Sequence, residues 1–240
     1  MSLAGPAGML LVDKPTGWTS HDCVAVLRKL FPRGTKVGHS GTLDPLATGL
    51  LVVLVGPCTK LQERLQGFDK TYSGTIRLGV RTETGDVTGK IAEEKPLPSL
   101  CLEQLKKEVG ALVGTVEAPA PAYSAVKHEG KKLYEYARAG EAVPVKPRKT
   151  TVRSWDALAW EEPELTYRLT CSSGTYVRTL AELLGERLGC GGTVSTLRRE
   201  TVGPFTLAQA RPLDEWRRMP ATDLTACLAA SIPPLEAALK

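Results

Sequence analysis

Apolar residues follow two spacings along this chain, and each spacing predicts a kind of element. Alternation of apolar and polar residues predicts strands over 71–80 and 165–171. Apolar residues three and four apart predict a helix over 102–112. The unbroken apolar run 50–55, bounded by turn residues, predicts a buried strand. A second helix is predicted over 175–188.

Weaker signals complete this pattern. Further strands are predicted over 10–13, 150–160 and 193–202, and further helices over 20–30, 57–66, 130–139 and 213–217. Either Thr19 or Ser20 is expected to cap the first of these helices. The tail then passes through Ile232-Pro233-Pro234 near its end. Because strands and helices intermix without a regular βαβ alternation, we predict an α+β fold with a mixed, largely antiparallel central sheet and flanking helices.

Composition limits the class of protein. The 240 residues are 42% hydrophobic and 24% charged, as in soluble globular proteins. No segment approaches the ~20 apolar residues of a transmembrane helix, so no membrane partner is expected. The six cysteines contain no C-x-x-C pair and the three histidines are scattered, so no metal site is expected. These features predict reduced thiols and a cytoplasmic protein.

Positive charge is concentrated in one stretch of the chain. The whole chain has a formal net charge of +5, and residues 127–153 hold eight basic and three acidic side chains, which also net +5. A local basic patch is typical of a phosphate-binding surface. A solvated helix and loop would explain the same pattern equally well.

One stretch places a carboxylate where a scaffold commonly presents a reactive group. Asp44 lies among three glycines and a proline between 38 and 49, just before the apolar run 50–55. These residues predict a tight loop braced by a core strand. On spacing alone, an Asp that merely caps a turn is the alternative.

The run Gly38-His39-Ser40-Gly41-Thr42-Leu43-Asp44-Pro45-Leu46-Ala47-Thr48-Gly49 resembles the catalytic loop of the TruB-type tRNA pseudouridine synthases, G-H-x-G-x-L-D-P-x-A-x-G. The resemblance implies a pseudouridine synthase fold and makes Asp44 the catalytic nucleophile. Pseudouridine formation detaches uracil from ribose and rejoins it through C5. This isomerisation needs neither redox chemistry nor energy input, so no cofactor is expected.

Other stretches resemble further motifs of that family. Lys70-Thr71-Tyr72 resembles the motif of the active-site tyrosine, which makes Tyr72 a candidate for stacking and proton transfer. Ser173-Gly174-Thr175-Tyr176-Val177-Arg178 resembles the motif that supplies Arg178 as the partner of the carboxylate, with Tyr176 on the substrate side. Thr196-Leu197-Arg198-Arg199 resembles the motif in which Leu197 forms an apolar wall of the pocket. Alone, each also fits an ordinary strand or helix residue.

The resemblance also implies how RNA is held. His39 is expected to pack into the RNA loop in place of the extruded base, because the target atom is inaccessible in a stacked loop. Residues 121–138 resemble the family's thumb, and we call residues 120–150 the thumb segment. Its candidate phosphate-binding residues are Lys127, Lys131, Lys132 and Arg138. Lys14-Pro15 matches an N-terminal motif expected to support the active site, and Lys14 is included among the substrate-side residues.

The sequence therefore predicts a tRNA pseudouridine synthase that modifies the uridine at position 55 of the TΨC loop. Its expected partner is the T-arm stem-loop of tRNA, with no obligate protein partner. The expected organisation is a flexible leader (1–7), a catalytic domain (8–205) and a helical tail (206–240) in place of the family's usual RNA-binding (PUA) domain.

Three other functions were considered. A guide-RNA-dependent synthase of the dyskerin type shares the Asp loop, and activity on bare tRNA separates it from the tRNA enzyme. In a non-catalytic RNA-binding or RNA-folding protein, Asp44 would be dispensable. A hydrolytic glycosidase normally needs two carboxylates acting together, and the sequence offers no convincing second acid.

Overall fold

The computed structural model describes residues 5–141 and 143–239, and these form two compact units. Unit 1 draws on Met1–Tyr72 and Leu197–Lys240, and unit 2 on Ser73–Thr196. Strands β4 (Lys70–Leu78) and β12 (Gly192–Val202) each contribute residues to both units. Residues 1–4 of the expected leader lie outside the described residues.

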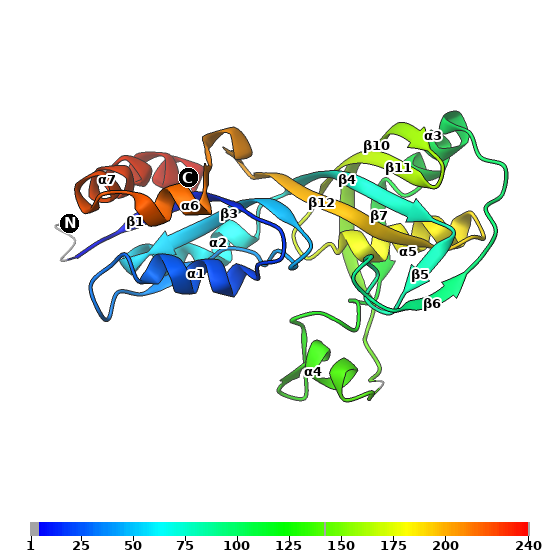
Figure 1. Cartoon of the computed structure of the whole chain (residues 1–240), viewed down its shortest axis with the longest axis horizontal. Coiled ribbons are helices and arrows are strands. Elements are labelled where there is room, and N and C mark those ends of the chain that lie inside the picture. Colours follow the sequence, from blue (N-terminus) through cyan, green and yellow to red (C-terminus); the bar gives the residue numbers. More distant parts are fainter. Residues whose placement is uncertain (1–4, 142, 240) are drawn as a thin grey trace. The chain divides into compact units, whose positions relative to one another are not determined.

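Ten strands form the main sheet, in the order β14-β1-β3-β12-β4-β11-β10-β7, with β2 added to β3 and β13 to β12 (Figure 1). In unit 1, the strands are β1 (Gly8–Lys14), β2 (Val37–His39), β3 (Thr48–Val55), β13 (Phe205–Thr206) and β14 (Arg211–Pro212). In unit 2, they are β7 (Gly114–Ala118), β10 (Arg148–Glu161) and β11 (Glu164–Cys171). The β1–β3, β2–β3, β12–β13, β10–β11 and β7–β10 pairs are antiparallel, and β1–β14 and β3–β12 are parallel. The predicted mixed, largely antiparallel α+β fold is confirmed.

Helices cover unit 1 and close its apolar core. They are α1 (Ser20–Arg28), the 3₁₀ helix η1 (Gly56–Leu61), α2 (Gln62–Gln66), the 3₁₀ helix η2 (Leu207–Gln209), α6 (Leu213–Arg218) and α7 (Ala221–Ala238). Every residue of the run 50–55 is 0% exposed, which confirms the predicted buried strand. Leu50, Val52 and Leu54 pack in one cluster with Val202 and Leu235.

The last helix adds to the expectation for the tail. The sequence predicts one short helix near 213–217 within a helical tail, and α6 confirms it. The structure adds α7, which runs through Pro233 and Pro234. Its buried residues Leu224, Leu228 and Leu235 lie on one side, and the helix packs against β1 (Figure 1). Burial of this apolar side offsets the unfavourable effect of proline inside a helix.

Unit 2 packs long strands with the helices α3 and α5, and α4 lies in its thumb segment. Strands β10 and β11 form the predicted hairpin, and the alternating residues Leu165, Tyr167, Leu169 and Cys171 are buried as the period-two pattern requires. Helices α3 (Leu102–Gly110) and α5 (Val177–Arg187) contact each other, and α3 also packs on β10. Within the described chain, none of the helices combines the length and the apolar character needed to cross a bilayer.

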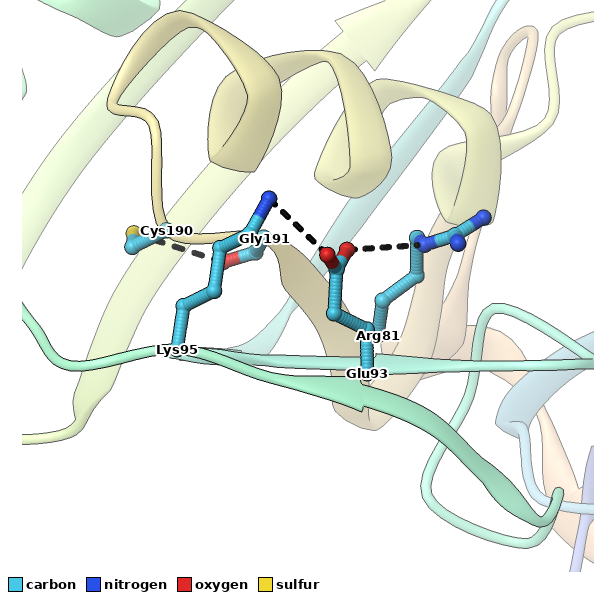
Figure 2. A network of polar contacts seen from close by, with 5 residues as sticks. All are labelled: Arg81, Glu93, Lys95, Cys190 and Gly191. Atoms are coloured by element: carbon cyan, nitrogen blue, oxygen red, sulfur yellow. Dashed lines mark hydrogen bonds and ion pairs between the residues drawn. The ribbon is translucent and has the colours of Figure 1, made fainter.

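Strands β5 (Val80–Thr82) and β6 (Ile91–Glu94) form a small hairpin that was not predicted. The sequence predicts instead one strand that continues to residue 80. The chain turns at Gly79, whose φ is +87°. Figure 2 shows Glu93 between two cations, with Arg81 Nε at 3.5 Å and Lys95 Nζ at 3.0 Å. The Lys95 hydrogen bond and the two positive charges lower the pKa of Glu93. Beside them, the Cys190 thiol donates to the Gly191 carbonyl at 3.4 Å.

The thumb segment differs from its prediction at one boundary. The sequence predicts a helix from 130 to 139, but α4 covers only Leu133–Arg138. The preceding residues form a hairpin of β8 (Lys127–His128) and β9 (Lys131–Lys132), in which Glu129 has φ +48° and Gly130 has φ +89°. Glycine at the second turn position favours this tight hairpin over a helical turn.

Gly49 allows β3 and β12 to approach closely, and its replacement tests how much unit 1 depends on that approach. Its φ is +98°, and an added Cβ would lie 2.4 Å from the Arg199 carbonyl oxygen. We therefore expect Gly49→Ala to lower the free energy of unfolding by more than about 2 kcal/mol. Gly34→Ala is the control, because Gly34 has φ +91° but no described atom within 4 Å of an added Cβ. If urea denaturation gave both variants the same loss in free energy of unfolding, the close approach of β3 and β12 would contribute nothing to stability.

Candidate active site

Asp44 lies on the loop between β2 and β3, as predicted. Its side chain is half-buried, whereas Leu43 and Ala47 beside it are 3% and 0% exposed. The Ala47 amide donates to the Asp44 carbonyl at 3.1 Å, and the Ser40 amide donates to the Val52 carbonyl at 2.9 Å. The first bond closes a turn within the loop, and the second ties the start of the loop to β3.

The strand register places two buried cations on either side of Gly49, the second residue of β3. Gly49 pairs with Lys14 of β1 on one edge and with Arg199 of β12 on the other. Lys14 is 0% exposed and Arg199 is 1% exposed. Buried cations need oxygen partners because they have lost those of water, and the loop supplies two of them, the carbonyls of Gly41 and Pro45.

Lys14 holds the carbonyl next to the candidate nucleophile. Its Nζ donates to Trp18 O at 2.6 Å, to Pro15 O at 2.9 Å and to Pro45 O at 3.5 Å. Burial lowers the pKa of Lys14 from 10.5 to about 8, while the negative charge of Asp44 acts to raise it. The support role expected for Lys14 thus corresponds to defined contacts with the loop.

Arg199 holds the other side of the loop. Its Nε donates to Leu50 O at 2.7 Å, and its Nη2 donates to Gly41 O at 3.1 Å. The sequence analysis assigned no role to this residue. The available signal is its position two residues after Leu197 in a strand, because that spacing directs a charged side chain to the same face as an apolar one.

A serine and a threonine hold the middle of the loop. Leu43 N donates to Ser20 Oγ at 2.8 Å, and Ser20 Oγ donates to Leu43 O at 3.1 Å. Thr16 Oγ1 donates to Leu46 O at 3.2 Å. Of the two predicted N-caps, Thr19 caps α1. Its Oγ1 accepts from the Asp22 amide, and the Asp22 carboxylate accepts from the Thr19 amide. Ser20 is thereby available to bind the loop.

Three other candidate residues also belong to unit 1. His39 ends β2, and burial together with the positive charge of Arg199 lowers its pKa. A neutral imidazole at pH 7 favours packing against a base over pairing with phosphate. Tyr72 of β4 and Leu197 of β12 are each 8% exposed. Unit 1 thus contains the carboxylate, its supporting cations and the candidate base-contacting residues.

The remaining candidates lie in unit 2. Tyr176 is the residue before α5 and is half-buried, and Arg178 is in the first turn of α5 with 4% exposure. Arg178 Nη1 donates to Thr84 O at 2.6 Å, and Nη2 donates to Tyr123 O at 2.8 Å. The pairing of Arg178 with Asp44 remains an expectation of the sequence.

The basic residues of the thumb segment are arranged around aromatic rings. Lys132 Nζ lies 5.4 Å and Arg138 Cζ 5.3 Å from the centre of the Tyr134 ring. Lys131 Nζ lies 5.7 Å from the centre of the Tyr136 ring. Lys127 precedes them in β8 and is exposed. Cations and aromatic faces at one place can contact both phosphates and bases of a single-stranded RNA loop.

The pKa of Lys14 reports how closely the cation and the carboxylate interact. We expect an NMR titration of the Lys14 side chain to give a midpoint near 8, and a lower midpoint in Asp44→Asn because the charge that raises it is gone. Since the folded-state pKa lies below the unfolded value of 10.5, the unfolded chain binds more protons between pH 8 and 10.5. Stability relative to Lys14→Met should therefore rise with pH in that window. An unchanged midpoint in Asp44→Asn would contradict the interaction.

Two family models together cover most of the chain. Residues 28–177 match the N-terminal domain of the TruB family pseudouridylate synthases. Residues 178–240 match the tRNA pseudouridylate synthase B C-terminal domain. The first match includes Asp44, and the second begins at Arg178 and includes Leu197 and Arg199.

Curated proteins and solved structures agree with these models. The chain is 46% identical over 211 residues to a tRNA pseudouridine synthase B of Ralstonia nicotianae, covering 86% of this chain and 67% of that protein. It is 47% identical over 208 residues to the protein of the same name from Burkholderia mallei, covering 86% and 68%. A crystal structure of a Cbf5-Nop10-Gar1 complex matches with a TM-score of 0.67 and 26% identity, over 87% of this chain and 53% of that one. The chain spans about two thirds of these curated relatives, and it belongs to the TruB family of pseudouridylate synthases.

Proposed function

We propose that this chain is a tRNA pseudouridine synthase, an isomerase that converts the uridine at position 55 of the T-arm loop to pseudouridine. The observation that carries the proposal is the rigid presentation of Asp44 by Lys14, Ser20 and Arg199 within the family's loop motif. Identity of 46–47% to proteins named tRNA pseudouridine synthase B supports tRNA as the substrate. Together with the tRNA substrate, we propose the cytoplasm as the place of the reaction.

The reaction fits a site with one essential carboxylate. The bond between N1 of uracil and C1′ of ribose breaks, the base turns, and a bond forms between C5 and C1′. The proton at C5 leaves and N1 gains one, so atoms and charge balance without a redox partner. Asp44 acts on the base or on C1′ as nucleophile, and a loop that is already fixed lowers the reorganisation that this step requires.

The other candidate residues have separate tasks in this proposal. Arg178 keeps Asp44 ionised and oriented, and Tyr72 stacks on the displaced base and offers a phenol for proton transfer. Leu197 closes the pocket with an apolar wall, which strengthens electrostatic interactions inside it. His39 occupies the space that the extruded base leaves in the RNA loop.

A guide-RNA-dependent synthase is the second candidate. Solved structures whose titles name Cbf5 complexes and an H/ACA RNP share the fold of this chain. The identity to the Cbf5 complex chain is 26%, against 46–47% to the tRNA pseudouridine synthase B proteins. The comparison favours the tRNA enzyme, and the two candidates differ in whether bare tRNA is a substrate.

Replacement of the carboxylate tests the catalytic assignment. We expect Asp44→Asn to lower turnover by at least about 10³-fold while tRNA affinity stays within about twofold, because only a group of the reaction centre is lost. Release of tritium from C5-labelled uridine measures turnover, and filter binding measures affinity. Asp214→Asn is the control, since Asp214 is an exposed carboxylate paired with Arg217 on α6. Full turnover by Asp44→Asn would exclude the proposed mechanism.

Replacement of the thumb cations tests the RNA contact. We expect the triple alanine variant of Lys131, Lys132 and Arg138 to bind tRNA more weakly and to reduce the salt slope of log K by about 2, because three phosphate contacts are lost. The control removes three exposed cations elsewhere in unit 2: Lys90, Lys106 and Lys107. If both triple variants showed the wild-type slope, the thumb cations would be merely a solvated face.

A further inference from the structure

We propose that Arg178 has a second task, in addition to pairing with the carboxylate: its guanidinium anchors the base of the thumb segment. One side chain would then position both the reaction centre and the helix that binds RNA. This inference rests on the proposed function, because it gives the thumb segment its role in holding tRNA. It assigns to Arg178 a positioning role for RNA binding that its place in the family motif does not require.

The contacts of Arg178 within unit 2 carry the argument. Its Nη2 donates to Tyr123 O at 2.8 Å, and its Nη1 donates to Thr84 O at 2.6 Å. Tyr123 lies near the start of the thumb segment, and Thr84 lies in the turn after β5. The side chain is 4% exposed, so water does not compete strongly for these donors. The planar guanidinium therefore joins α5 to two separate chain segments at fixed angles.

Backbone hydrogen bonds continue from this anchor to the helix that carries the cations. Ser124 follows Tyr123 directly, and its carbonyl accepts from the Tyr134 amide at 3.1 Å. The Val126 carbonyl accepts from the Leu133 amide at 2.8 Å. These two bonds hold the first turn of α4, in which Leu133 is 2% exposed. A displacement of Tyr123 would thus be transmitted to α4 and to the cations around Tyr134.

Open grooves border the base of the thumb segment. Ala118, Pro119 and Ala120 line two of them, and Thr179 of α5 lines both with them. Ser124, which follows Tyr123, is 5% exposed, so the base is fixed where Arg178 reaches it. The hydrogen bond to Tyr123 O is therefore a direct attachment of this base to α5.

By thermodynamic linkage, the effects of Arg178 and of bound tRNA on the thumb segment are reciprocal. If Arg178 favours the docked thumb segment, then tRNA bound to the thumb segment favours the docked position of Arg178 by the same factor. Binding of RNA to the thumb segment would in this way hold the Arg178 guanidinium at the Tyr123 and Thr84 carbonyls.

Limited digestion with trypsin in the absence of RNA tests the anchor directly. We expect Arg178→Lys to be cleaved about tenfold faster after Lys127, Lys131, Lys132 and Arg138, because one ammonium nitrogen cannot occupy the positions of Nη1 and Nη2 at once. Cleavage after Arg217 and Arg218 of α6 serves as the internal reference, because α6 belongs to unit 1 and loss of an anchor within unit 2 should leave it unchanged. Asp44→Asn is the matched control and should be digested at the wild-type rate.

Affinity for tRNA supplies the second readout. We expect Arg178→Lys to bind tRNA about tenfold more weakly than wild type, in contrast to Asp44→Asn. If Arg178→Lys does not fold, Arg178→Gln, which keeps an amide donor without the charge, takes its place in both assays. The proposal would be overturned if the folded Arg178 variant were cleaved in the thumb segment at the wild-type rate. It would also be overturned if Asp44→Asn were cleaved there as fast as the Arg178 variant. Full turnover by Asp44→Asn would instead refute the proposed function and leave the digestion result to decide the anchor.

Discussion

The burial of two cations beside one glycine is the constraint on which the rest of unit 1 depends. Lys14 and Arg199 face Gly49 from neighbouring strands and have almost no exposure to water. Their charges are tolerated because backbone carbonyls of the Asp44 loop and of the turn after β1 replace lost water. Only a residue without a side chain leaves room for the Arg199 backbone at this position. The cations and the loop thus stabilise each other, and a fixed carboxylate results.

This arrangement suits chemistry that depends on one carboxylate. A loop held through Gly41, Leu43, Pro45 and Leu46 has little freedom to rearrange when charge develops on a substrate. The negative charge of Asp44 also reduces the unfavourable effect of burying Lys14. Stability and function are therefore supplied by the same contacts. RNA binding is assigned to different surfaces, with a neutral His39 in unit 1 and aromatic-lined cations in unit 2.

The sequence predicted most of the regular elements because their apolar patterns are strong. The alternation over 165–171 and the apolar run 50–55 correspond to buried strand residues, and the Gly- and Pro-rich stretch between 38 and 49 contains the loop around Asp44. Helix α7 lies in the predicted helical tail, but its extent through two prolines was not predicted, because it depends on packing against β1. The hairpin before α4 depends on the local conformation at Glu129 and Gly130. Such tertiary and turn effects leave weak signals in a single sequence.

At the candidate site too, local motifs were predicted from the sequence and long-range contacts were not. The loop motif singles out Asp44, but nothing in the motif says that Arg199 and Ser20 hold the loop, because those contacts join residues far apart in the chain. Ser20 was expected as a possible helix cap, and the neighbouring Thr19 has that role. The motifs thus singled out the candidate catalytic residue and Lys14, whereas the supporting contacts of Ser20 and Arg199 required the three-dimensional structure.

We propose that a single fixed carboxylate isomerises one uridine of tRNA without guide RNA or protein partners. Pseudouridine mapping of one unmodified tRNA transcript, incubated with this chain alone, tests this function most directly. We expect conversion confined to the uridine at position 55 of the T-arm loop. A transcript that is bound but not converted, or converted at scattered uridines, would contradict it.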